Sequence, residues 1–104
     1  MLTRAYIPYK GYYSSPFCKW QGQLSTFNPI TLGAETAKRW FVHSAIDPAV
    51  LDYLYYGATV ASNRMFYAHT WSGAILMDGK KEIPGLYVHQ ACTTAATCIH
   101  LAAL

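Results

Sequence analysis

Cys92 is the residue of this chain whose position best suits nucleophilic chemistry. It follows the apolar run Leu86–Gln90, which predicts a buried strand, and it precedes small residues that favour a helix. Free N–H groups and the positive end of the helix dipole stabilise a thiolate at a helix N-terminus, and the thiolate is the reactive form of cysteine. The small neighbours Ala91 and Ala95 leave room for a substrate. The alternative interpretation is a small hydrophobic side chain that packs in the core.

The other two cysteines carry no predicted chemistry. Cys98 lies further along the same expected helix and is predicted to pack, whereas Cys18 lies in a loop. An odd number of cysteines without a CxxC pair argues against a disulfide scaffold and against a thiolate zinc site. A reduced, cytoplasmic setting is therefore expected.

Common motifs for phosphate or metal chemistry do not occur in the sequence, which has no P-loop, GxGxxG, HExxH, GxSxG or EF-hand pattern. The histidines are far apart in the chain: His43, His69, His89 and His100. We therefore expect no metal site and no bound cofactor.

Composition limits the class of protein. The chain has 104 residues, of which 53% are hydrophobic and only 12% charged, with a formal net charge of +3. Disorder is excluded because it needs low hydrophobicity, and dedicated nucleic-acid binding is excluded because the basic residues are scattered. The length permits one domain. Such an apolar surface on a short chain predicts a partner that covers it, or a part of the protein that is missing.

The N-terminal quarter is predicted to form a strand followed by a long loop. Ala5–Lys10 contains residues that favour a strand, with Pro8 placing that strand at an edge or bulge. Gly11–Asn28 has no helical period, and a loop of this length is commonly functional. Its aromatic residues predict a stacking surface for a ligand ring, the plug of a hydrophobic floor, or a subunit contact: Tyr12, Tyr13, Phe17 and Trp20.

The rest of the chain alternates helices and strands. Asn28 and Pro29 predict a helix start, and the helical spacing of apolar residues continues to about Ser44. The further predicted elements are a strand over Tyr53–Tyr56, a helix over Arg64–Met77 that packs through small and aromatic residues, the strand Leu86–Gln90, and a helix from Cys92. This β-α-β-α-β-α order indicates an α/β fold with a mostly parallel sheet.

The last 22 positions, 83–104, contain no Asp, Glu, Lys or Arg. A buried strand and helix explain this better than a membrane span, because His89, Gln90 and several threonines would have to enter lipid. The chain also stops in an apolar helix without a Gly cap. We therefore expect residues 1–104 to be a partial domain, truncated within its third helix.

Taken in order, several segments resemble the N-terminal part of the thiolase family, of the acetyl-CoA acetyltransferase type. Residues 88–95, Val-His-Gln-Ala-Cys-Thr-Thr-Ala, are similar to the family's nucleophile motif. Other stretches match the family in order and spacing: Ser15–Leu24, similar to its Pro-Phe…Lys…Gly…Leu stretch, then Leu32–Ala34, Ile46–Pro48 and Val50–Gly57.

The resemblance implies a layered α/β sandwich of two similar halves, usually dimeric, of which this chain holds most of one half. It also implies that Cys92 takes an acyl group from a coenzyme A thioester, which is the substrate rather than a bound cofactor. In the family, a His and a second Cys from the C-terminal half supply the base. The chain alone is therefore expected to show no turnover.

Two departures from the family pattern favour a second hypothesis. His89 stands where thiolases have Asn, Ser or Thr, and the position after the cysteine holds the bulkier Thr93. The alternative is a non-catalytic subunit of thiolase fold that serves as a binding or scaffold partner. A third hypothesis is a sister condensing enzyme, such as a ketoacyl synthase.

Overall fold

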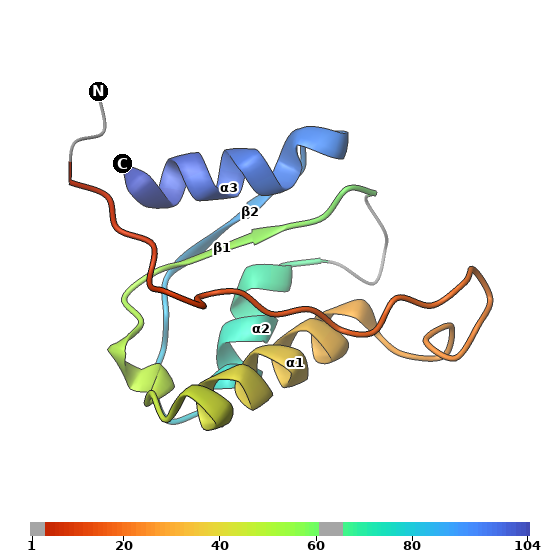
Figure 1. Cartoon of the computed structure of the whole chain (residues 1–104), viewed down its shortest axis with the longest axis horizontal. Coiled ribbons are helices and arrows are strands. Elements are labelled where there is room, and N and C mark those ends of the chain that lie inside the picture. Colours follow the sequence, from red (N-terminus) through yellow and green to blue (C-terminus); the bar gives the residue numbers. More distant parts are fainter. Residues whose placement is uncertain (1–3, 61–65) are drawn as a thin grey trace.

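The computed structural model describes residues 4–60 and 66–104. Its main elements are helix α1 (Pro29–Ser44), strand β1 (Leu54–Gly57), helix α2 (Ala68–Leu76), strand β2 (Gly85–Val88) and helix α3 (Thr94–Ala103). Two short 3-10 turns, at Pro48–Val50 and Ala91–Thr93, precede β1 and α3. The two strands form a small sheet with α3 on one face and with α2 and α1 on the other (Figure 1).

Helix α1 has the predicted limits because its ends are marked by side chains and backbone conformation. The Asn28 Oδ1 atom accepts hydrogen bonds from the N–H groups of Ile30 at 2.9 Å and Thr31 at 3.4 Å. Pro29 occupies the first turn, where no donor is needed. Ala45 ends the helix in the left-handed region, with φ 55°.

Strands β1 and β2 are parallel, as the alternation of helices and strands predicts. Leu54 pairs with Gly85, and Gly57 pairs with Val88 at the other end. The predicted strands Tyr53–Tyr56 and Leu86–Gln90 therefore occur, but β1 is displaced by one residue, and β2 begins one residue earlier and ends two residues earlier than predicted. Within the described residues the sheet has these two strands and no third.

The core consists of two small clusters between α1, α2 and the sheet. In one, Ile30 and Ala68 pack with Tyr56 and Tyr87. The other is formed by five residues: Ala37, Phe41, Leu76, Trp40 and Leu51. The buried positions of α1 are the ones that the helical spacing predicts.

Helix α2 packs through small residues, but the prediction that aromatic residues share this face is wrong. Ser72 and Gly73 are buried, whereas Trp71 is 61% exposed. A Cβ on Gly73 would come within 3.8 Å of Ile83, so the helix lies close to the segment before β2. The expected start of this helix at Arg64 lies outside the described residues.

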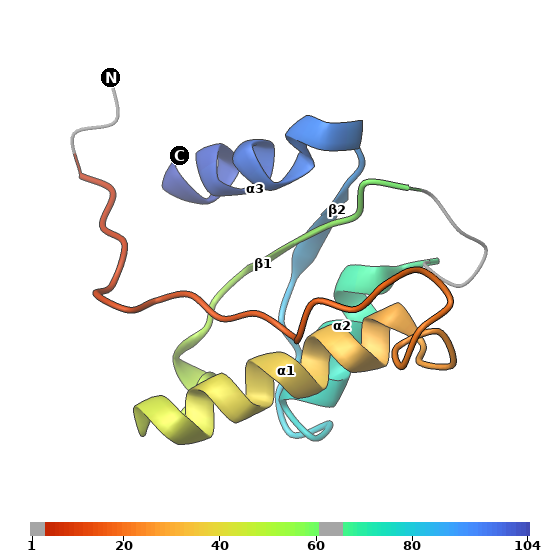
Figure 2. The same ribbon diagram turned by 45° about the vertical axis from the view of Figure 1, so that its right-hand side comes forward.

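The predicted first strand over Ala5–Lys10 is wrong. This segment has no strand structure, and Gly11 donates its N–H to the carbonyl of Pro8 at 2.9 Å, so the chain turns there. Lys10 adopts φ 57°, which a continuous strand does not permit. Residues 11–19 then form an extended segment, the N-terminal strap, which runs along α1 (Figure 2).

One ion pair joins α1 to the turn after α2. The Lys38 Nζ atom lies 2.6 Å from the Asp78 Oδ1 atom. This ammonium holds the pKa of Asp78 below its ordinary value, and the hydrogen bond to Asp78 raises the pKa of Lys38. Because the pair lies at the surface, with Asp78 exposed and Lys38 partly exposed, it contributes little to stability.

Candidate functional site

Cys92 lies between the end of β2 and the start of α3, and its side chain is exposed. The predicted strand-to-helix position is therefore confirmed, although regular helix begins at Thr94 rather than at Cys92. The three residues Ala91–Thr93 form the intervening 3-10 turn. This turn projects from the sheet edge where both parallel strands end (Figure 1).

Ala91, immediately before Cys92, adopts a left-handed backbone conformation with φ 47°. This conformation costs an alanine about 1–2 kcal/mol relative to the ordinary helical region. Surrounding contacts must hold such a residue in place, and strained turns of this kind are common where a side chain is positioned for function.

Thr94 supplies the buried hydrogen bonds that hold the turn. Its side chain is only 4% exposed. The Oγ1 atom accepts a hydrogen bond from the Gln90 N–H at 2.9 Å and donates one to the Ala91 carbonyl at 2.8 Å. One hydroxyl group therefore forms hydrogen bonds with the backbone before and after the Cα atom of Ala91.

Two further threonines fix Gln90 from the helix side. The Thr93 hydroxyl donates to the Gln90 carbonyl at 2.8 Å, and the Thr97 hydroxyl donates to the Gln90 side-chain oxygen. The Thr93 N–H also donates to the Gln90 carbonyl, at 3.1 Å. Thr93, which follows the cysteine and departs from the thiolase pattern, thus contributes to the geometry of the turn.

His89 connects the ends of the two strands. Its Nδ1 atom lies 2.8 Å from the Ala58 carbonyl oxygen. Because a carbonyl oxygen only accepts, Nδ1 carries the proton in this contact. His89, the second departure from the thiolase pattern, therefore has a structural role. It joins the chain beyond β1 to the turn that bears Cys92.

The three cysteines have different surroundings. Cys98 is half-buried under Gly57, and burial raises the pKa of its thiol. This agrees with its predicted packing role. Cys18 is exposed in the N-terminal strap. A shallow hollow of about 300 Å³ lies over Cys98, between Gly57 and Ile99, and Cys92 does not line it.

Of the four aromatic residues predicted as a stacking surface or floor, one packs on the body of the protein. Tyr13 contacts Trp40 with a ring-centroid distance of 6.2 Å. Phe17 and Trp20 are 99% and 86% exposed, and Tyr12 is also exposed. Residue type alone does not separate these four aromatic residues in the sequence. Tyr13 differs from the others because the path of the strap brings it against α1.

A layer of polar side chains between α2 and the sheet was not predicted. The His69 Nδ1, Ser72 Oγ and Tyr87 hydroxyl atoms are buried and have no hydrogen-bond partner in the described part of the chain. Burial also raises the pKa of the neighbouring Tyr56. No cysteine belongs to this layer.

Groups of three or more His, Cys, Asp or Glu side chains that could hold a metal ion do not occur in residues 4–60 and 66–104. Over the same ranges, no helix has both the length and the apolar character that a membrane crossing requires.

Comparison with known proteins adds no relative. No protein-family model, no curated protein and no solved structure gives a significant match to this chain. The interpretation of the Cys92 site therefore depends on its residues and geometry.

Proposed function

We propose that this chain is the N-terminal part of a thiolase-like acyl-CoA acyltransferase in which Cys92 is the nucleophile. The observation that carries the proposal is the exposed Cys92 thiol on a strained turn between a parallel strand and a helix. Ligands of open α/β sheets collect at this carboxyl edge of the strands.

The reaction follows from covalent catalysis by a thiolate. The Cys92 Sγ atom forms a bond to the carbonyl carbon of the acyl thioester, and the bond from that carbon to the coenzyme A sulfur breaks. Coenzyme A leaves as a thiol, with the proton that Cys92 released. Transfer of the acyl group to a second thiol or carbon nucleophile then regenerates Cys92.

The base for these proton transfers is assigned to no residue of this chain. By resemblance to thiolases, it belongs to a His and a second Cys of the family's C-terminal half. We therefore expect the chain alone to give no turnover of acetyl-CoA, and catalytic cleavage by residues 1–104 would contradict this part of the proposal.

The surface of α3 supports the proposed layered sandwich. Ala95, Ala96 and Ile99 are exposed on this helix, and no charged side chain occurs from position 83 to 104. An uncharged, exposed helix face suits burial under a further layer. A second half of the protein, packed over α3, would supply that layer and complete a site around Cys92.

Alkylation with iodoacetamide tests the nucleophile. Cys92 is expected to react faster than Cys18 and Cys98 below pH about 8, the range in which an ordinary thiol is mostly protonated. Cys18 is the matched control because it is also exposed, and Cys98 reports the effect of burial. Peptide mapping by mass spectrometry gives the three rates separately.

The rival function is a non-catalytic scaffold of the same fold, and the third candidate is a ketoacyl synthase-like condensing enzyme. Equal, slow labelling of all three thiols would favour the scaffold. A fast Cys92 thiol agrees with either enzyme, and acyl transfer from an acyl-CoA in the complete protein favours the thiolase-like activity.

A further inference from the structure

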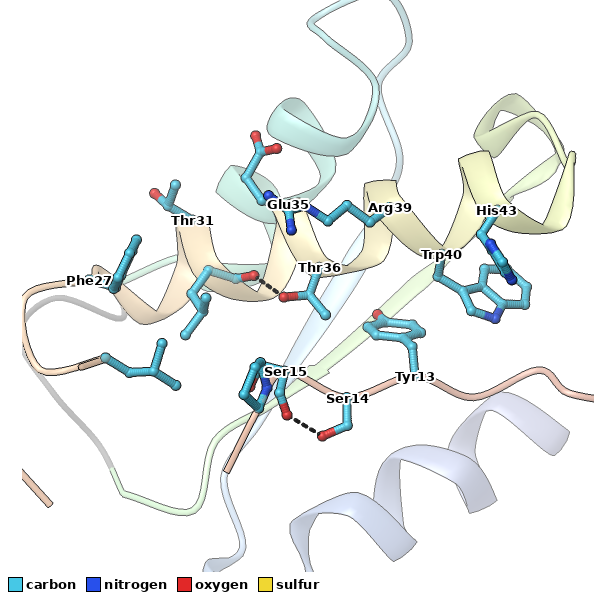
Figure 3. Close-up of a pocket in the computed structure, with 13 residues that line it drawn as sticks. Tyr13, Ser14, Ser15, Phe27, Thr31, Glu35, Thr36, Arg39, Trp40 and His43 are labelled. Carbon is cyan, nitrogen blue, oxygen red and sulfur yellow. Dashed lines mark hydrogen bonds between the residues drawn. The ribbon is translucent and has the colours of Figure 1, made fainter. Parts of the chain in front are cut away.

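A groove of about 710 Å³ lies between α1 and the N-terminal strap (Figure 3). Helix α1 lies on the face of the sheet opposite α3 (Figure 1). One wall is α1. The other is the strap at Tyr13–Pro16 together with Leu24 and Phe27, where the chain returns toward the helix. The volume falls within the range of about 300–1,000 Å³ that is usual for small-molecule sites.

The floor of the groove is a row of α1 residues spaced by four: Leu32, Thr36 and Trp40. The Thr36 hydroxyl donates to the Leu32 carbonyl at 2.6 Å, so this polar group is already satisfied (Figure 3). The row spans eight residues, or about 12 Å at the helical rise per residue. A narrow floor of this length suits an extended alkyl chain.

Tyr13 and Trp40 close one end of the groove. Their rings are in contact, and the Trp40 Nε1 atom donates to the Lys10 carbonyl at 3.1 Å. Partial burial raises the pKa of the Tyr13 hydroxyl. These contacts hold the strap against the helix, so the groove has a fixed width at this end.

The rim is a second row of α1 residues, and it carries the charge: Thr31, Glu35, Arg39 and His43. Within residues 4–60 and 66–104, Arg39 has no ion-pair partner. The nearest cation to Glu35 is Lys38, at 3.9 Å, and Lys38 is held more closely by Asp78. An unpaired guanidinium beside an apolar floor favours an anionic ligand with an apolar body.

We infer that this groove binds an amphipathic carboxylate with a medium-length alkyl chain. The chain lies along the floor between Leu32 and Trp40, and the carboxylate pairs with Arg39. Arg39 suits this role because its planar guanidinium can donate two parallel hydrogen bonds to a carboxylate. The inference does not depend on the proposed function, because Cys92 does not line the groove.

Decanoate is the probe, and the fluorescence of Trp40 is the signal. Trp20 and Trp71 are 86% and 61% exposed, so Phe at both positions leaves Trp40 as the single tryptophan with little effect on packing. In this background, decanoate below its micelle concentration is expected to give a saturable change. Decanol, which lacks the charge, and acetate, which lacks the chain, are each expected to bind at least tenfold more weakly.

Variants of the rim separate the two parts of the site. Arg39→Gln is expected to weaken decanoate binding about tenfold and to leave decanol binding unchanged, because only the charge-assisted contact is lost. Glu35→Gln is the matched control on the same row, and it is expected to strengthen decanoate binding by removing a like charge. Circular dichroism of each variant confirms that the helix is retained.

Three outcomes would overturn the inference. If decanoate gives no saturable signal, the site is excluded. If decanol binds as tightly as decanoate, the groove associates with apolar chains without recognising the carboxylate. Equal affinity of decanoate for the parent and for Arg39→Gln excludes Arg39 as the anion-binding group.

Discussion

Thr94 makes two hydrogen bonds that hold the turn before the candidate nucleophile. Its buried hydroxyl group accepts from the Gln90 N–H and donates to the carbonyl of Ala91, the left-handed residue that precedes Cys92. The Cys92 side chain is exposed and takes no part in these hydrogen bonds. The position of the thiol is therefore set by a threonine of the following helix.

Replacing Thr94 by Val tests this role, because Val has nearly the same shape but no hydroxyl group. The variant leaves the Gln90 N–H without its hydroxyl partner, whereas the Ala91 carbonyl keeps the hydrogen bond from the Thr94 N–H, and we expect a loss of about 0.5–1.5 kcal/mol in the free energy of unfolding. Urea denaturation measures the loss. Thr94→Ser keeps the hydroxyl group and is expected to lose less, so equal losses in the two variants would contradict the prediction.

At this scale the sequence predicts the position of Cys92 but not the contacts around it. The change from an apolar strand to a run of small residues is visible in the residue types, and the structure confirms it. The left-handed Ala91 is not visible, because alanine is not a residue type that signals this conformation. His89 and Thr93 look like mere departures from a family pattern until their hydrogen bonds are known.

At the scale of elements, the close approach of α3 to β1 depends on Gly57. A Cβ atom at this position would overlap the Thr94 Cγ2 atom and would lie 2.9 Å from the Cys98 Sγ atom. The absence of a side chain on β1 therefore allows α3 to lie directly on the strand.

Gly57→Ala is expected to lower the free energy of unfolding by about 1–3 kcal/mol, because the helix must move away from the strand. Gly73→Ala is the matched control: its Cβ would lie 3.8 Å from Ile83, and alanine favours the helix by about 0.5–1 kcal/mol. Urea midpoints of the two variants are expected to shift in opposite directions. A second change, Thr94→Ser, removes the overlapping methyl group and is expected to recover part of the loss in Gly57→Ala.

The elements that the sequence predicts well are those with local signals. Helix α1 has a side-chain cap at Asn28 and a proline in its first turn, and both act within a few residues. The expected strand at Ala5–Lys10 had only strand propensity, which measures how well residues fit a half-buried sheet surface. No strand in the described part of the chain pairs with this segment, and Tyr6 and Tyr9 remain 89% and 91% exposed.

The proposed groove illustrates a second limit. Its α1 wall could be recognised as two rows of residues spaced by four, but its other wall is the strap, which comes from the segment predicted as strand and loop. The path of the strap depends on the contact of Tyr13 with Trp40, between residues that are distant in the sequence. Residue types alone do not indicate that contact.

At the scale of the whole molecule, the two helical faces of the sheet differ in charge. The outer side of α1 carries Glu35 and Arg39, whereas α3 exposes Ala95, Ala96 and Ile99 in a stretch without charged residues. Among residues 4–60 and 66–104, no other helix lies over the outer side of α3 in either view (Figures 1 and 2). An apolar face of this kind favours association, because contact removes apolar surface from water.

We therefore expect the chain alone to self-associate through α3, in a manner that depends on concentration. Ile99→Lys places a charge in the centre of that face and is expected to shift sedimentation velocity profiles toward the monomer. Val42→Lys is the matched control, because Val42 is even more exposed, at 82%, but lies on α1. Association that both variants reduce equally would point to non-specific contacts, and a wild-type chain that stays monomeric at high concentration would contradict the prediction. Selective loss in Ile99→Lys identifies α3 as the surface through which the chain self-associates.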